Sequence, residues 1–131
     1  MSDRTAFRRA VEAGDLGAMI DAFAGDGILN SPVSFHPFRG RKAVGALLSV
    51  LVDVLEDFEY TDEYDSPAGG KALVFRARVG DRELQGVDLL RFDASGLIAD
   101  LTVLVRPLSG LQALLAAVGP RLQALQEKAE S

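Results

Sequence analysis

The sequence contains no cysteine and no tryptophan, and it has one histidine among its 131 residues. Without cysteine the chain can form no disulfide, no thiolate metal site and no thiol nucleophile. The single histidine, His36, leaves carboxylates as the other potential metal ligands, and these show no ligand spacing. We therefore expect neither a metal ion nor a cofactor, and the candidates for chemistry are few.

Positive charge is also scarce, because 14 Lys and Arg residues face 19 Asp and Glu residues and give a net charge of −5. This balance argues against nucleic acid or an anionic membrane surface as a partner, since both require a basic face. The most apolar segment, 44–55, contains Asp53 and, at about 12 residues, is too short to span a bilayer. The N-terminal arginines precede no apolar signal segment, so we expect a cytoplasmic protein.

The length and composition indicate a single domain over residues 1–131 that is large enough for one hydrophobic core. Apolar residues at helical spacing predict four helices, over residues 3–13, 16–24, 41–56 and 108–126. In the last of these, Gly119-Pro120 either kinks the helix or starts a separate short one.

Between the helices, alternating and β-branched segments predict strands over residues 28–33, 58–64, 71–79 and 83–106, the last being a hairpin. Gly80-Asp81 and the segment 93–96 are the expected turns, each with a glycine able to take positive φ. This order predicts an α+β domain in which helices pack on one face of a curved antiparallel sheet. Such a cone encloses a cavity, and cavities of this kind bind ligands.

Asp88 is the most informative single residue of the predicted sheet. Strand alternation places it on the same face as Leu84 and Leu90, so it is a lone carboxylate on an apolar face. Burial there should raise its pKa, because desolvation disfavours the charged form. Asp88 is either a structural acid, bonded to a hydroxyl such as that of Tyr60 or Tyr64, or a working acid or base at the pocket floor.

Other candidate site residues come from the loop that precedes the long helix and from the last strand. His36 has the side chain best suited to proton transfer near pH 7, and it is expected at the pocket mouth or simply exposed. Asn30 and Ser31 are ligand-binding candidates or turn residues. The remaining ligand-binding candidates are Tyr60 and the inward face of the last strand, with Leu101, Val103 and Val105.

Three segments carry a resemblance to a known family: VEAGD at 11–15, FRGR at 38–41 and VDLLRFD at 87–93. With the order of elements, they resemble the nuclear transport factor 2-like (NTF2-like) superfamily, which includes SnoaL-like and ketosteroid-isomerase-like proteins. The resemblance covers residues 5–107 and leaves 108–126 as an appended helix. It implies a cystatin-like cone with an interior pocket, and dimers formed through the outer sheet face.

The resemblance does not carry over the full ketosteroid isomerase site. The neutral oxyanion-hole Asp of those enzymes falls on Asp88. Their general base falls on Ser31, and their oxyanion-hole Tyr falls on Phe7, and neither residue can abstract a proton at neutral pH. We therefore do not expect ketosteroid isomerase activity.

Two other branches of the superfamily fit no better. The epoxide hydrolase relay requires an Arg where this chain has Gly86. The cyclases use an acid in the last strand, where Asp100 is expected to point to the outer face.

Three hypotheses follow, and the sequence leaves open whether the protein is an enzyme. The first is a small dimeric protein that binds a compact hydrophobic molecule in the cone. The second is an isomerase, cyclase, dehydratase or epoxide hydrolase that uses Asp88 with His36. The third is a dimeric interaction module whose cone is filled by side chains.

Overall fold

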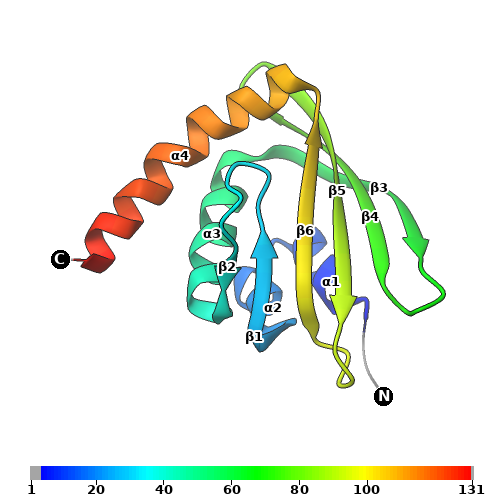
Figure 1. Cartoon of the computed structure of the whole chain (residues 1–131). Helices are drawn as coiled ribbons and strands as arrows, with labels where there is room; N and C mark the ends of the chain where they lie inside the picture. The colour runs from blue at the N-terminus through cyan, green and yellow to red at the C-terminus, as the bar shows by residue number, and fades with distance from the viewer. Residues whose placement is uncertain (1–3, 131) are drawn as a thin grey trace.

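In the computed structural model, which describes residues 4–130 without the side chains of 126–130, six strands form one curved, open sheet (Figure 1). The strand order is β2-β1-β6-β5-β4-β3. Every neighbouring pair is antiparallel except β1 and β6, which run parallel. The strands are β1 (Phe23–Asn30), β2 (Phe38–Arg39), β3 (Glu56–Asp65), β4 (Lys71–Val79), β5 (Arg82–Phe92) and β6 (Ile98–Arg106).

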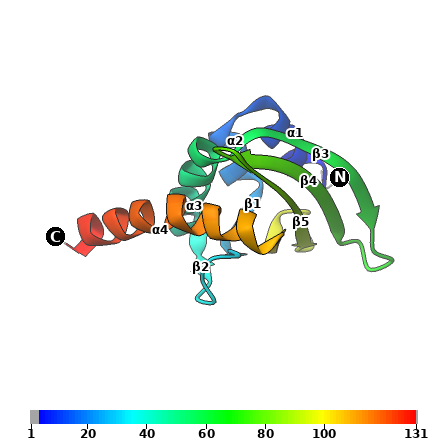
Figure 2. The same cartoon turned by 90° about the horizontal axis from the view of Figure 1, so that it is seen from above.

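Four helices accompany this sheet: α1 (Ala6–Ala13), α2 (Leu16–Asp21), α3 (Gly40–Val54) and α4 (Leu108–Glu130). The first three lie inside the curve of the sheet, and β3 and β4 arch around α1 (Figure 2). The first part of α4 crosses the ends of the central strands and packs on α3, and its C-terminal part extends beyond the body. The predicted α+β cone is therefore confirmed.

Both predicted turns form as expected. Gly80, with φ of 61°, and Asp81 join β4 to β5, and Val79 pairs with Arg82 across the turn. Gly96, with φ of 83°, closes the second turn, in which the Gly96 N–H donates to the Asp93 carbonyl. A side chain at either glycine would strain the backbone, because L residues rarely adopt these angles.

The predicted end of the second helix is wrong. The sequence predicts a helix over 16–24 that includes Phe23, but α2 stops at Asp21 and Phe23 begins β1. Phe23 pairs with Ile98 in the parallel ladder between β1 and β6, and its side chain is fully buried. Its spacing from Met19 suits either structure, so the long-range pairing decided the outcome.

Of the two alternatives for Gly119-Pro120, the separate short helix is absent. The helix α4 runs without a break from Leu108 to Glu130, with Pro120 inside it. Proline removes one backbone hydrogen bond to the residue four positions earlier, here Ala116. Pro120 and Ala116 are both exposed, so water can satisfy the freed carbonyl group. No helix among the described residues is long and apolar enough to cross a membrane.

The hydrophobic core lies between the concave face of the sheet and the helices. Its fully buried members come from the sheet and from the helices, and they include Phe23, Leu29, Val44, Leu47, Leu73, Ile98, Leu101 and Val118. The predicted apolar stripe of the long helix contributes Val44 and Leu47, as expected for a helix packed on a sheet. This arrangement places the concave face of β3 to β6 over the remaining interior space.

Candidate functional site

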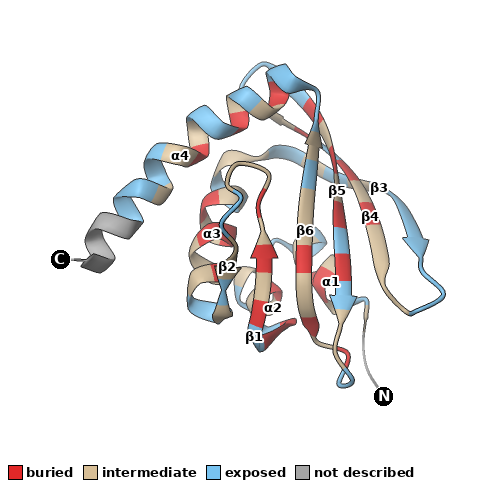
Figure 3. Ribbon diagram, in the orientation of Figure 1, coloured by how far each residue is buried: buried red, intermediate tan, exposed pale blue. Residues whose placement is uncertain are grey.

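Asp88 lies on the concave face of the sheet, near the middle of β5. Buried and exposed positions alternate along this strand, as Figure 3 shows, and the pattern places Asp88 inward. Its register partners are Leu73 on β4 and Val103 on β6, so its in-plane neighbours are apolar. The residue is 6% exposed. The alternation that predicted its burial is therefore confirmed.

The hydroxyl group of Tyr60 on β3 donates a hydrogen bond of 2.8 Å to Oδ2 of Asp88. The sequence offered Tyr60 and Tyr64 as donors, and a bulge decides between them. Tyr60 pairs with Phe75, but the register shifts before Asp62, and Tyr64 moves to the outer face, where it is 62% exposed. Asp88 Oδ1 has no hydrogen-bond partner among the described residues.

Burial raises the pKa of Asp88 to about 7, and the hydrogen bond from Tyr60 opposes this shift. Burial and the neighbouring Asp88 carboxylate raise the pKa of Tyr60 well above its ordinary range. Tyr60 therefore keeps its proton and acts as a donor. Asp88 exchanges its proton near neutral pH, which is the range in which a general acid or base is most effective.

The two residues line an interior cavity of about 490 Å³ between the sheet and the helices α1, α3 and α4. Its walls are mostly apolar, and they include Leu101, Val103 and Val105, the inward face predicted for the last strand. Leu48 and Leu51 close it on the side of α3, and Leu114 closes it on the side of α4. The cavity therefore combines a large apolar surface with one deeply buried acid.

Three aromatic rings form one wall of the cavity. Phe58 and Phe75 stack with ring centroids 4.8 Å apart, and Tyr60 meets Phe58 edge to face at 5.0 Å. Gly86 on β5 makes room for this group, because a Cβ there would collide with the Phe75 ring and with the Leu104 carbonyl. The resemblance to epoxide hydrolases drew attention to Gly86 only because those enzymes have an Arg at this position. The sequence did not predict that Gly86 makes room for the Phe75 ring.

The structure does not bring Asn30 to this cavity. Parallel pairing of β1 with β6 sets Asn30 opposite Thr102. Its amide donates to Thr102 Oγ1 at 3.0 Å and to Asp100 Oδ1 at 3.3 Å. Asp100 and Thr102 alternate with the cavity-lining Leu101, so these polar groups lie on the outer face, as predicted for Asp100.

Ser31 and His36 are likewise not among the residues that line the cavity. Ser31 is buried, and its hydroxyl group accepts a hydrogen bond from the Val33 N–H, as in a turn. His36 is exposed in the segment between β1 and β2. Among the described residues, the hydrogen-bond partner of Asp88 is Tyr60, and His36 makes no contact with it.

Arg8 on α1 is a neighbour of the site that the sequence did not single out. Its guanidinium lies over the Tyr60 ring, 5.5 Å from the centroid. It donates to Glu63 on β3 at 3.0 Å and lies 3.4 Å from Glu12. Arg8 thus connects α1 to β3 beside the tyrosine that bonds Asp88. The sequence did not predict this contact, because Arg8 is one of several charged residues on the polar face of a short helix.

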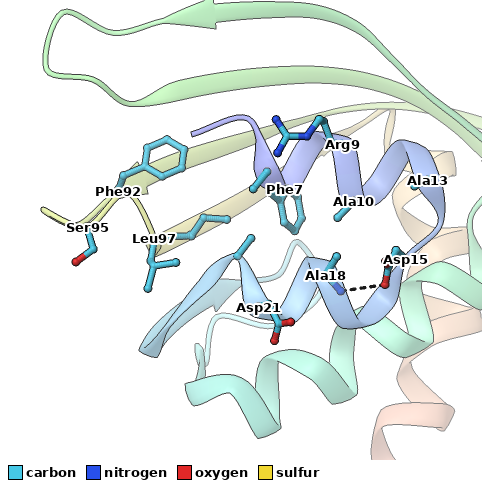
Figure 4. A pocket seen from close by; sticks show the side chains of 14 residues that line it. Phe7, Arg9, Ala10, Ala13, Asp15, Ala18, Asp21, Phe92, Ser95 and Leu97 are labelled. Carbon is cyan, nitrogen blue, oxygen red and sulfur yellow. Dashed lines mark hydrogen bonds between the residues drawn. The ribbon is translucent and has the colours of Figure 1, made fainter. Parts of the chain in front are cut away.

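A second cavity, also of about 490 Å³, lies between α1, α2 and the turn from β5 to β6 (Figure 4). Phe7 lines both cavities. The charged residues here lie at the surface, and Asp15 caps α2 by accepting from the Ala18 N–H at 3.0 Å. Among the described residues, no three His, Asp or Glu side chains form a group that could hold a metal ion.

Comparisons with known proteins agree with this architecture. The chain is similar to the crystal structure of a steroid delta-isomerase from Pseudomonas aeruginosa, with 37% identity and a TM-score of 0.84, over 92% of this chain and 89% of that one. It is also similar to an uncharacterised protein with a cystatin-like fold from Silicibacter pomeroyi DSS-3, with 28% identity, a TM-score of 0.84, and coverage of 91% and 84%.

A more distant likeness is to the epoxide hydrolase/cyclase-like enzyme SalBIII, with 19% identity and a TM-score of 0.66 over 79% of this chain and 87% of that one. At this identity the likeness concerns the fold alone. No curated protein matches the sequence. The SnoaL-like domain matches residues 5–101, which is most of the chain and includes Tyr60 and Asp88. The chain belongs to the SnoaL-like family, within the NTF2-like superfamily.

Proposed function

We propose that this protein binds a compact hydrophobic molecule in the interior cavity, with Asp88 as the polar anchor. The observation that carries this proposal is a buried carboxylate with one bonded oxygen and one oxygen left without a protein partner. Asp88 lines the cavity, so a ligand donor can reach this second oxygen and take the place of water there. The volume of about 490 Å³ also favours ligand binding over the alternative of a cone filled by side chains.

Thermal unfolding of the wild type against a panel of steroids, terpenoids, polyketide-like aromatics and fatty acids tests binding. A compound present at about 100 times its Kd should stabilise the fold by roughly 2.7 kcal/mol. Asp88→Asn should weaken that shift, whereas Asp62→Asn, at an exposed position on β3, should leave it unchanged. If no compound shifts the melting temperature and Asp88→Asn alone lowers it, Asp88 is structural.

Tyrosine fluorescence provides a second readout that does not depend on a melting transition. The chain has two tyrosines and no tryptophan, so Tyr64→Phe leaves Tyr60 as the sole strong emitter. Tyr60 lines the cavity, and we expect its emission to change when a ligand binds. A compound that stabilises the fold without changing this emission binds elsewhere.

A second candidate function, a proton-transferring enzyme, is favoured by the pKa of Asp88 near 7. Asp88 would transfer the proton, and Tyr60 would donate the hydrogen bond that stabilises its charged form. The similar Pseudomonas aeruginosa protein is described as a steroid delta-isomerase. In this chain Ser31 and Phe7 occupy the positions implied for the base and the tyrosine of such enzymes.

Each compound that stabilises the fold should therefore be assayed for isomerisation, dehydration and hydrolysis, with a Δ5-3-ketosteroid among the substrates. The enzyme hypothesis predicts that Asp88→Asn abolishes turnover and that His36→Ala leaves it unchanged. Turnover that survives Asp88→Asn would exclude Asp88 as the proton-transferring group.

We further propose that two copies pair through the outer face of the sheet. Leu89 is 41% exposed and Leu104 is 52% exposed, and Leu104 pairs with Val87 to extend the apolar patch across β5 and β6. Exposed contiguous apolar surface of this kind is typical of an interaction site. Light scattering should give the mass of a dimer for the wild type and of a monomer for Leu104→Glu. A monomeric wild type would refute the proposal.

A further inference from the structure

The charged residues that line the interior cavity all have one sign. They are Asp88 inside it and Glu12 and Glu59 at exposed positions along its edge. Among the described lining residues there is no Lys, Arg or His. A ligand carboxylate or phosphate would therefore lose its hydration without gaining a cation, which is a large cost in an apolar cavity.

The cation nearest to the aromatic wall is already neutralised. The Arg8 guanidinium lies over Tyr60, but it is bonded to Glu63 at 3.0 Å and paired with Glu12 at 3.4 Å. Lys71 donates a second bond to Glu63, at 3.0 Å, and one to Asp65, at 2.7 Å. Recruiting Arg8 to an anion in the cavity would break these contacts.

The polar atom offered to a ligand is an acceptor. Tyr60 donates to Oδ2 of Asp88, and Oδ1 remains without a partner among the described residues. The rings of Phe58, Tyr60 and Phe75 surround this side of the cavity. Aromatic faces attract cations through their quadrupole. A group that carries both N–H donors and positive charge suits this environment better than a neutral hydroxyl.

We propose that the cavity selects its ligand by charge, accepting an apolar amine whose N–H group donates to Asp88 Oδ1 and rejecting apolar acids. This inference rests on the proposed function, because it names the chemical class of the molecule bound at the same site. It narrows the ligand from hydrophobic molecules in general to those with a donor, with amines preferred over alcohols and carboxylates excluded.

Three probes with one apolar skeleton test the proposal: 1-adamantylmethylamine, 1-adamantylmethanol and 1-adamantanecarboxylate. We expect the amine to bind wild type about tenfold more tightly than the alcohol, since a charge-assisted hydrogen bond is stronger than a neutral one. We expect no measurable binding of the carboxylate. Calorimetric titration at pH 8 and the fluorescence of Tyr60 in Tyr64→Phe give independent affinities.

Two variants separate the roles of the charged groups. Asp88→Asn keeps the size of the side chain but removes its charge, so the amine should lose its advantage while the alcohol still binds. Arg8→Gln removes the nearby cation and should leave the preference for the amine in place. If Asp88→Asn is too unstable to measure, Tyr60→Phe serves as the second variant. It removes the hydrogen bond to Asp88 Oδ2 and should change the affinity for the amine more than the affinity for the alcohol.

The results also separate this inference from the proposed function. Carboxylate binding as tight as amine binding would overturn the charge selection while leaving the cavity a ligand site, and loss of that binding in Arg8→Gln would identify Arg8 as the anchor. Binding of the neutral compounds of the broader panel, with no binding of the amine, would overturn the inference alone. If neither the probes nor the panel bind, the proposed function fails and the inference fails with it.

Discussion

The interior cavity and the cavity between α1 and α2 have the same volume, about 490 Å³, but different chemistry. The interior cavity contains Asp88, a buried acid with a free acceptor oxygen. The cavity between α1 and α2 has Asp15 and Asp21 at exposed positions, and Asp15 already caps a helix. Volume alone therefore does not identify a ligand site. The distinguishing property is a largely buried acid whose second oxygen has no protein partner among the described residues.

The largest expected effect concerns Phe7, which lines both cavities. Phe7→Ala should destabilise the fold by about 3–5 kcal/mol, because it removes a buried ring and leaves space that the surroundings cannot fill. Phe92→Ala, which affects a half-buried ring at the second cavity alone, should cost less. Urea unfolding measures both. Equal losses would show that the buried ring of Phe7 contributes no more to stability than the half-buried ring of Phe92.

The next largest effect is the pH dependence that Asp88 confers on stability. Its folded pKa of about 7 is above the value of an exposed carboxyl group, so the folded state binds the extra proton between these values. The contribution of Asp88 is therefore fully present below about pH 4 and is lost as pH rises through 7. The loss should reach up to about 4 kcal/mol.

The measurement is the difference in unfolding free energy between wild type and Asp88→Asn at pH 5, 6, 7 and 8. This difference should shift against the wild type as pH rises. Asp21→Asn, which removes an exposed carboxylate from the second cavity, is the matched control. A difference that stays constant with pH would show that Asp88 is charged throughout, and the contrast between the cavities would lose its basis.

Tyr60→Phe should have a smaller effect, about 1–3 kcal/mol, because it leaves the Asp88 carboxylate without its donor. The hydrogen bond from Tyr60 lowers the pKa of Asp88, so its removal should raise that pKa further. The carboxyl carbon shift of Asp88, followed by NMR against pH, reports the change directly. An unchanged midpoint would mean that the bond contributes nothing to the charge state of Asp88.

The smallest effect is expected at Asp15 in the second cavity. Asp15→Ala removes the N-cap of α2 and should cost about 1 kcal/mol. It should not alter the shift in melting temperature that a ligand of the interior cavity produces, because Asp15 does not line that cavity. A reduced ligand shift would show that the two cavities are coupled.

Local patterns in the sequence predicted much of this architecture. The alternation in β5 was sufficient to place Asp88 inside, and that in β6 placed Leu101 and Val103 on the same concave face. Both follow from the two-residue period of a strand, which depends on no distant contact. The turn at Gly80 was also predictable, because only a local backbone conformation is required.

Contacts between distant segments decided the rest. Asn30 faces outward because β1 pairs in parallel with β6, and the same pairing converts Phe23 from a helical to a strand residue. Arg8 reaches Glu63 because the sheet curves around α1. Hydrophobic periodicity in the sequence predicts neither the pairing of β1 with β6 nor the bond from Arg8 to Glu63, because the residues involved are far apart along the chain.

The choice of Tyr60 over Tyr64 shows the division most clearly. The sequence by itself determined that Asp88 would be a buried acid on an apolar face, with a tyrosine of the strand predicted over 58–64 as one available donor. The tertiary structure decided which tyrosine, because a bulge between Tyr60 and Asp62 reverses the facing of the residues that follow. A strand period is local, but the register between strands depends on their pairing, and that pairing set the chemistry of the cavity.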